Sequence, residues 1–277
     1  MRKNKVLLVS DFVGVGKVAL STMIPILNTM EANVSYLPTA VVSNNFDYGE
    51  AVVEELTDFM KNSKDLWKKL DFQFDIIYTG IIMNTDQVDT IKEIIQYHHK
   101  KPLIISDPIM GDDGELYPGL SKELIEASRL MALEADIIIP NLTEFCLIVG
   151  RDYLGPDKLE HSKIVAWLNK ARGRGVKSAI ITSVHIRDEY YVYGYSEKED
   201  IFRVKVDYVP VHVGGAGDVF SSLIIGRYVK EPNLKKSIEY TTKVLTAIIR
   251  KEYQEGVKGK VNEIKIQNHL QEIYKSL

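Results

Sequence analysis

The stretch that decides the fold class is the segment Lys5–Leu20, KVLLVSDFVGVGKVAL, near the start of the chain. Its first five residues form a short apolar run of the kind that becomes a buried strand. Two glycines, Gly14 and Gly16, then predict a turn, and the apolar pattern over residues 18–30 predicts a helix shortened or kinked at Pro25. A strand, a turn and a helix in this order are the first half of a βαβ unit.

The same rhythm continues along the chain. Further strands are predicted at 33–37, 75–79, 103–106, 136–139 and 178–182, and helices at 48–69, 86–97, 121–132, 142–149 and 163–172. After residue 182, two strand patterns at 189–195 and 201–206 flank a charged tip at Ser196–Asp200 and predict an antiparallel hairpin at the sheet edge. Helices at 216–228, 234–253 and 263–277 follow. We therefore expect one domain over residues 1–277, a three-layer α/β/α sandwich with a mostly parallel central sheet.

The composition excludes several classes of protein. The chain has 277 residues, of which 45% are hydrophobic and 26% charged, and a net charge of −3. This charge favours neither nucleic acid nor an acidic membrane as a partner. The apolar runs are too short to span a membrane or to form a signal peptide. The single cysteine, Cys146, allows no intrachain disulfide, so we expect a cytoplasmic protein.

The opening glycines raise the question of a nucleotide site. A P-loop needs a glycine where the chain has Asp11 and a hydroxyl where it has Val18. The segment GVGKVA fits the dinucleotide pattern G-x-G-x-x-G/A, but that fold also needs a carboxylate at the end of the second strand. The chain has Leu37, Pro38 and Thr39 there. A dinucleotide site thus stays a minor alternative to a simple tight turn.

A second glycine cluster carries more chemistry. It reads VGGAGDVF over residues 213–220, and an apolar helical pattern follows it directly. Successive N–H groups at a helix start attract anionic oxygens, and Asp218 would lie in the first turn beside them. This arrangement suits transfer of a phosphoryl group from ATP to an alcohol, with Asp218 accepting the hydroxyl proton. The alternative is an acidic residue that only favours the helix start.

Acidic residues follow other predicted strands. The segment SDPIMGDDG, residues 106–114, includes Asp107 and Asp112, and PNLTE, residues 140–144, includes Glu144. Open α/β sheets bind ligands at this edge, and Mg²⁺ prefers a few carboxylates with water and phosphate oxygens. The alternatives are a solvated acidic loop for the first segment and a helix cap at Glu144 for the second. Thr182 ends another strand, where its hydroxyl could meet phosphate oxygens.

Taken in this order, these motifs resemble the ribokinase-like superfamily and, within it, the vitamin B6 kinases. GGAGD is similar to the superfamily signature G-[TAV]-G-D, DPIMGDDGELY to the DPVMGD…G…Y stretch of pyridoxal kinases, and PNLTE to their PN-x-x-E. The segments LPTAVVSN, residues 37–44, and SDFVGVGKVALSTMIPIL, residues 10–27, also resemble the bacterial enzymes. The resemblance extends over about residues 6–249.

The resemblance implies ATP-dependent phosphorylation of the 5′-hydroxymethyl group of pyridoxal, pyridoxamine or pyridoxine. It implies a homodimer and the cofactors ATP and Mg²⁺, with a monovalent cation as an optional activator. Asp218 would be the general base beside an anion hole of Gly215, Ala216 and Gly217. The implied metal ligands are Asp107, Asp112 and Glu144; the ATP site adds Ile139, Asn141, Thr182 and Gly217; the acceptor site comprises Ser10, Asp11, Ser43, Phe46, Tyr117 and Asp218.

Besides an opening loop that is shorter than in the commoner pyridoxal kinases, the chain departs from that family pattern at two places. Asn45 and Phe46 stand where relatives have a His-Thr pair, and Ile139 stands where they often have threonine. The first departure concerns the ring pocket, where Phe46 could stack on a ring instead. Hydroxymethylpyrimidine (phosphate) kinase therefore stays open as an alternative. An NAD-binding Rossmann enzyme and a non-catalytic B6-binding protein are more distant ones.

Overall fold

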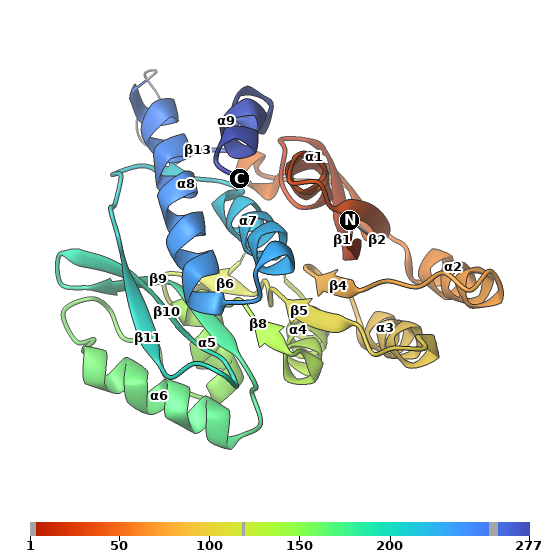
Figure 1. Cartoon of the computed structure of the whole chain (residues 1–277), viewed down its shortest axis with the longest axis horizontal. Coiled ribbons are helices and arrows are strands. Elements are labelled where there is room, and N and C mark those ends of the chain that lie inside the picture. Colours follow the sequence, from red (N-terminus) through yellow and green to blue (C-terminus); the bar gives the residue numbers. More distant parts are fainter. Residues whose placement is uncertain (1–3, 118–119, 255–259) are drawn as a thin grey trace.

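The computed structural model describes residues 4–117, 120–254 and 260–277 and is built on one large sheet (Figure 1). The strand order is β11-β10-β9-β8-β5-β4-β1-β2-β3. The parallel strands are β1 (Lys5–Val15), β2 (Asn33–Asn44), β4 (Ile76–Thr79), β5 (Leu103–Ser106), β8 (Ile137–Ile138) and β9 (Ala179–Ile186). Antiparallel strands extend the two edges: β3 (Val53–Glu55) on one side, β10 (Glu189–Tyr195) and β11 (Phe202–Val206) on the other.

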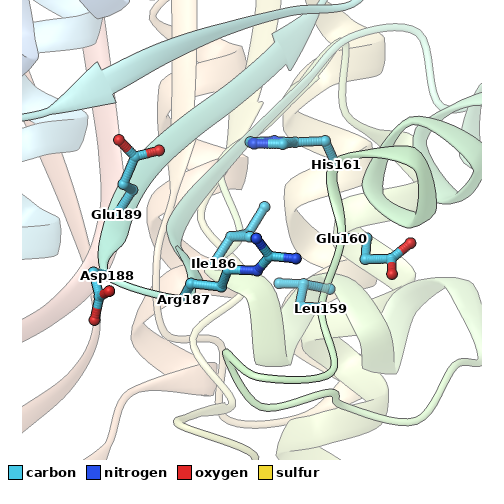
Figure 2. Close-up of a pocket in the computed structure, with 7 residues that line it drawn as sticks. All are labelled: Leu159, Glu160, His161, Ile186, Arg187, Asp188 and Glu189. Carbon is cyan, nitrogen blue, oxygen red and sulfur yellow. The ribbon is translucent and has the colours of Figure 1, made fainter.

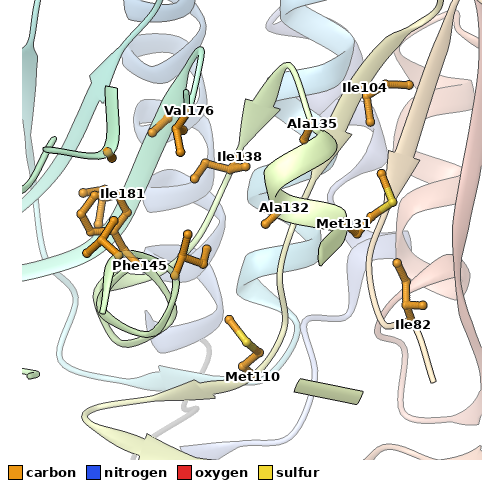
Figure 3. Close-up of a cluster of buried hydrophobic side chains, with 14 of the residues drawn as sticks. Ile82, Ile104, Met110, Met131, Ala132, Ala135, Ile138, Phe145, Val176 and Ile181 are labelled. Atoms are coloured by element: carbon orange, nitrogen blue, oxygen red, sulfur yellow. The ribbon is translucent and has the colours of Figure 1, made fainter. Parts of the chain in front are cut away.

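Helices cover both faces of this sheet, because its strands alternate apolar side chains between the two faces. In β1, Leu7 and Val9 belong to one core cluster and Val6 and Leu8 to the other. The first cluster, part of which is shown in Figure 3, packs under α2 (Thr57–Lys69), α3 (Thr85–Tyr97), α4 (Lys122–Glu134), α5 (Leu142–Val149) and α6 (His161–Gly173). The opposite face packs against α1 (Leu20–Thr29), α7 (Ala216–Lys230) and α8 (Leu234–Gln254). The predicted three-layer sandwich with an edge hairpin is confirmed.

The structure corrects the prediction in two segments. Residues 48–69 were expected to form one helix, but α2 begins only at Thr57, after the 3₁₀ turn Phe46–Tyr48 and strand β3. Strand β3 forms because it pairs with β2, with Val53 opposite Val42. The last helix is also shorter than expected, since the 3₁₀ turn Ile266–Asn268 precedes α9 (Leu270–Lys275).

Gly14 was expected in the turn before α1, and this is wrong. Strand β1 continues to Val15 because it pairs with β2 past a bulge between Ser10 and Phe12. Gly14 therefore lies in the strand, where a Cβ would come within 2.9 Å of the Ser43 carbonyl oxygen. The turn itself is made at Gly16, whose φ of 80° lies in the left-handed region that glycine tolerates.

Two small sheets border the carboxyl ends of the parallel strands. Strands β6 (Gly111–Asp112) and β7 (Glu115–Leu116) form a hairpin after β5, and β12 (His212–Val213) pairs in parallel with β13 (Lys260–Val261). The second pair ties the chain just before α7 to the C-terminal segment. Within the described ranges, no helix is both long enough and apolar enough to cross a membrane.

Candidate active site

Several of the predicted site residues lie on or directly after four strands of the central sheet, β1, β5, β8 and β9. Ser10 and Asp11 lie at the bulge of β1, Asp107 directly follows β5, and Asn141 follows β8. Asn141 forms a parallel bridge with Thr182 of β9. These strands are neighbours or near neighbours in the sheet, so their carboxyl ends form one edge. Helix α7 begins at the same edge.

Asp218 lies in the first turn of α7, which follows Gly215 in the left-handed conformation (φ 77°). The backbone N–H of Ala19 donates to Asp218 Oδ2 at 2.8 Å. Burial and, to a smaller extent, the nearby carboxylates of Asp107 and Asp11 together raise the pKa of Asp218 to about 7, against the lowering effect of the Ala19 N–H. A carboxylate whose pKa lies near neutrality suits a general base.

The helix start also offers backbone donors. The N–H groups of Gly215, Ala216 and Gly217 make no hydrogen bond within the described residues, and no side chain caps α7. The N–H of Gly214 donates to the Val261 carbonyl instead. The first N–H groups of a helix carry partial positive charge and bind anionic oxygens. Three uncapped backbone N–H donors therefore lie next to Asp218, and their role as an anion hole stays a prediction.

Asp107 is buried beside Asp218. Its Oδ2 accepts hydrogen bonds from Ser221 Oγ at 2.9 Å and from the Tyr78 hydroxyl at 3.3 Å. Burial raises the pKa of Asp107 to about 6, while these two donors oppose the rise. Ser221 lies three residues after Asp218, on the same side of α7. Asp107 thus joins the end of β5 to the helix that carries the candidate base.

Glu144 holds the neighbouring loops together. Its Oε1 accepts from the Met110 N–H at 3.0 Å, and its Oε2 accepts from the Asn141 N–H at 2.8 Å. The Asn141 side chain in turn accepts from the Glu144 N–H and donates to the Gly111 carbonyl, so the two residues form a capping box for α5. Burial raises the pKa of Glu144, and Asp107 and Asp112 raise it further. The helix-cap alternative is confirmed, and the role as metal ligand stays a prediction.

The remaining nucleotide-side residues are in place but have structural roles as well. Ile139 is buried in the core cluster under α1 and α7. Thr182 was expected to end its strand, but β9 continues to Ile186, so Thr182 lies within the strand. It is half-buried, and its N–H donates to the Pro140 carbonyl. Tyr117 is 40% exposed, and desolvation together with the charges of Glu144, Asp112, Asp107 and Asp218 raises its pKa.

The acceptor-side candidates divide into two groups. Ser10 Oγ donates to Asp11 Oδ1 at 3.1 Å and accepts from the Ile81 N–H, and both residues are buried. Burial raises the pKa of Asp11 to about 6. By contrast, Ser43 is exposed, and its hydroxyl donates to Asn44 and accepts from the Val52 N–H. Phe46 is 52% exposed, in the turn after β2.

The loop that carries Phe46 nevertheless lies next to the glycine cluster. A Cβ on Gly214 would come within 2.5 Å of Asp47 Oδ2. Asn45, which stands at a family histidine position, donates through Nδ2 to the Asn262 carbonyl at 2.6 Å. The departure from the family pattern thus ties β2 to the C-terminal segment in this chain.

The carboxylates meet the chemical requirements of Mg²⁺ only in part. Their oxygens are the hard ligands that this ion prefers, and their mutual repulsion would be relieved by a cation. Within the described ranges, however, no three acidic, His or Cys side chains converge as a metal cage. Mg²⁺ usually takes one or two carboxylates and fills the other positions with water and phosphate oxygens. The donor set therefore fits an ion that arrives with a nucleotide.

Sequence reasoning missed three residues of this site: Ala19, Tyr78 and Ser221. Only Ser221 had a detectable signal, since its spacing of three from Asp218 places it on the same side of a helix. Ala19 and Tyr78 are ordinary apolar or aromatic residues in the sequence, and their polar contacts follow from the fold. The opening turn also differs from a phosphate loop, because Glu263 and Asp218 accept from the N–H groups of Lys17 and Ala19.

A separate pocket lies between the β9–β10 turn and the start of α6 (Figure 2). Leu159, Glu160, His161, Ile186, Arg187, Asp188 and Glu189 line it. Its side chains carry both signs of charge, and none of the predicted site residues is among them.

Comparisons with known proteins agree with this arrangement. The model of the phosphomethylpyrimidine kinase family matches residues 27–262. A candidate pyridoxal kinase of Schizosaccharomyces pombe is 27% identical over 227 residues, which are 76% of this chain and 63% of the relative. Pyridoxal kinase of Arabidopsis thaliana is 28% identical over 185 residues, 63% of this chain and 58% of the relative. The chain thus spans less than two thirds of the length of these two curated relatives.

Solved structures match over nearly the whole chain. A candidate phosphomethylpyrimidine kinase of Bacteroides thetaiotaomicron, crystallised with pyridoxal, has a TM-score of 0.88 and 31% identity over 98% of this chain and 96% of its own. Pyridoxal kinase of Lactobacillus plantarum has a TM-score of 0.86 and 24% identity, over 98% and 97%. The predicted ribokinase-like fold is confirmed. On the family model and the 31% identical relative, the chain belongs to the phosphomethylpyrimidine kinase family of the ribokinase-like superfamily.

Proposed function

We propose that this chain is an ATP-dependent kinase, acting as one domain, that phosphorylates the 5′-hydroxymethyl group of a vitamin B6 vitamer. The observation that carries the proposal is Asp218, whose pKa is raised to about 7, in the first turn of α7 beside three backbone N–H groups. Base and anion hole adjoin each other there, as phosphoryl transfer to an alcohol requires.

Three sets of groups in this chain would have separate roles in the phosphoryl transfer. Asp218 in its ionised form accepts the proton of the attacking hydroxyl, which makes the oxygen a stronger nucleophile. The N–H groups of Gly215, Ala216 and Gly217 donate to the oxygens of the phosphoryl group as it moves between donor and acceptor. Asp107, held by Ser221 and Tyr78, keeps negative charge near Asp218 and so maintains its basicity.

The nucleotide side would be formed by residues that follow β5 and β8 and by Thr182 within β9. Asp107, Asp112 and Glu144 would hold Mg²⁺ directly or through water, and Mg²⁺ would neutralise charge on the ATP phosphates. Asn141, Ile139 and Thr182 would border the nucleotide. A monovalent cation would be an optional activator.

The acceptor pocket would lie between β1 and the loop after β2, with Ser10 and Asp11 as its buried polar groups and Ser43, Phe46 and Tyr117 at its rim. Support for a B6 vitamer comes from the Bacteroides relative crystallised with pyridoxal and from the relatives named pyridoxal kinase. Hydroxymethylpyrimidine is a second candidate acceptor, favoured by the family model's name and by Phe46 in place of the family threonine. We also propose a cytoplasmic homodimer.

A coupled assay of ADP release tests the proposal with pyridoxal, pyridoxamine, pyridoxine and hydroxymethylpyrimidine as separate acceptors. We expect turnover with at least one B6 vitamer at a kcat/KM at least tenfold above that with the pyrimidine. The reverse order would assign the pyrimidine as acceptor. An absence of turnover with all four compounds would refute the proposed function.

A further inference from the structure

Ala19 contacts the candidate base although it carries no side-chain chemistry. It precedes α1, is 4% exposed, and donates its N–H to Asp218 Oδ2 at 2.8 Å. Its backbone has φ 49° and ψ −134°, a conformation that residues with a Cβ rarely adopt. A strained residue persists only where its surroundings hold it, and such residues concentrate at functional sites.

Hydrogen bonds within the turn at residues 17–22 and a bridge to β1 hold Ala19 in this conformation. Its carbonyl accepts from the N–H groups of Thr22 and Met23 at 3.0 and 2.9 Å. Thr22 Oγ1 donates to the Lys17 carbonyl at 2.7 Å, which closes the turn over residues 17–22. Ala19 also forms an antiparallel bridge with Phe12 of β1. The direction of its N–H is therefore determined by the first βα unit.

The same turn lies between the anion hole and the C-terminal segment. On one side, a Cβ on Gly215 would be 3.0 Å from Val18 Cγ1 and 3.3 Å from the Lys17 carbonyl oxygen. On the other side, Glu263 accepts from the Lys17 N–H and Gln267 Oε1 accepts from Lys17 Nζ at 3.0 Å. Helix α1 lies next to both α7 and α9 (Figure 1), consistent with these contacts.

We propose that Ala19 is a positioning residue for Asp218 and that Glu263, through Lys17, keeps Ala19 in place. The Ala19 N–H occupies Oδ2 and orients the carboxylate, which leaves Oδ1 to accept the proton of the substrate hydroxyl. The C-terminal segment is thereby a working part of the active site, 246 residues from the turn that it supports. This inference rests on the proposed function of Asp218 as general base.

Two pairs of variants test this inference, and each pair consists of a test variant and its matched control. Ala19→Gly keeps the N–H but lets the turn relax, so we expect kcat to fall three- to tenfold while KM for ATP changes less than twofold and the melting temperature does not fall. Glu31→Gly is the control, since Glu31 also has a positive φ (68°) but lies at the other end of α1, where it pairs with Lys230. It should leave kcat unchanged.

The second pair is Glu263→Ala and Glu263→Gln. The alanine variant removes the acceptor for the Lys17 N–H, and we expect the same loss of kcat. The glutamine variant keeps a carbonyl oxygen in that place and should restore at least half of the wild-type kcat. Equal losses in both variants would overturn the role of this hydrogen bond.

A measurement without substrate separates this inference from the proposed function. The ¹³C-carboxyl signal of Asp218 is followed against pH in the wild type, Ala19→Gly and Glu263→Ala. Because the Ala19 N–H stabilises the ionised carboxylate, its displacement from Asp218 should raise the titration midpoint by at least half a pH unit in both variants. Unchanged midpoints overturn the inference whatever the activities are, and raised midpoints with unchanged kcat overturn its catalytic part. Failure of the wild type to phosphorylate any acceptor refutes only the proposed function.

Discussion

Replacement of Asp218 by asparagine should lower turnover by orders of magnitude and stabilise the protein at the same time. The asparagine has nearly the same shape, and its side-chain oxygen can still accept the Ala19 N–H, but it cannot take up a proton. General-base catalysis contributes about 10²- to 10⁴-fold, so we expect kcat to fall by that range. Affinity for ATP should change little, because the N–H groups at the start of α7 remain.

The stability gain follows from the raised pKa of Asp218. In the folded chain this pKa is about 7, against about 3.9 for an unperturbed aspartate, a difference of about three units. Because the folded state binds the proton more tightly, ionised Asp218 destabilises the fold, and the full cost is present above pH 7. At about 1.4 kcal/mol per unit, the upper limit is about 4 kcal/mol. The cost shrinks as the pH falls from 7 toward 4.

The assay combines activity with unfolding. Coupled ADP release gives kcat, nucleotide competition gives the ATP affinity, and urea unfolding at pH 8 and pH 5 gives the two free energies of unfolding. We expect the asparagine variant to be more stable than the wild type at pH 8 and to lose most of that advantage at pH 5. Near-normal kcat would refute the general-base role. If the variant and the wild type had the same free energy of unfolding at pH 8 as well as at pH 5, the argument from buried charge would be refuted.

Three further predictions concern the same region. The wild-type kcat/KM should rise with pH through about 7 and then level off, because only ionised Asp218 accepts a proton; an initial-rate series from pH 5.5 to 8.5 measures this. Ser221→Ala removes a hydrogen bond to Asp107, and a hydrogen bond to a charged group contributes about 1.5–3 kcal/mol. Because Asp107 is then held less firmly, calorimetry should show weaker binding of Mg²⁺-ATP. Gly226→Ala places a Cβ 2.4 Å from Met30 Sδ between α7 and α1, and should cost about 1–3 kcal/mol in thermal unfolding.

The elements that could be predicted from the sequence are those with local signals at both ends. Helix α5 begins and ends as predicted because Asn141 caps its start and Gly150 takes the left-handed conformation at its end. Strand β5 is a four-residue apolar run, and its bounds are also as predicted. Segment 46–56 has no such signal: it is mostly exposed, and β3 exists only through its pairing with β2. Pairing between distant segments is decided by the fold.

In the site, too, the features with a local sequence signal could be predicted, and those that depend on distant segments could not. The glycine cluster could be recognised because its donors and Asp218 are consecutive in the chain and need only a helix start to become an anion site. Glu144 could be recognised as acidic and near a strand end, but only the structure shows that it caps α5, and its role as a metal ligand stays a prediction. The raised pKa of Asp218 could not be predicted, since it depends on burial and on Asp107 and Asp11 from other strands.

The contact between Ala19 and Asp218 explains why the opening glycine turn looked like a nucleotide loop. Both kinds of loop follow the first strand, use a glycine with positive φ and direct backbone N–H groups toward an anion. Here the anions are the protein's own carboxylates, because the Lys17 N–H meets Glu263 and the Ala19 N–H meets Asp218. The sequence favoured a simple tight turn here, and the structure adds that the N–H groups of this turn bind negative charge within the protein. The identity of that charge was decided 199 residues further along the chain, where α7 brings Asp218 to the same edge of the sheet.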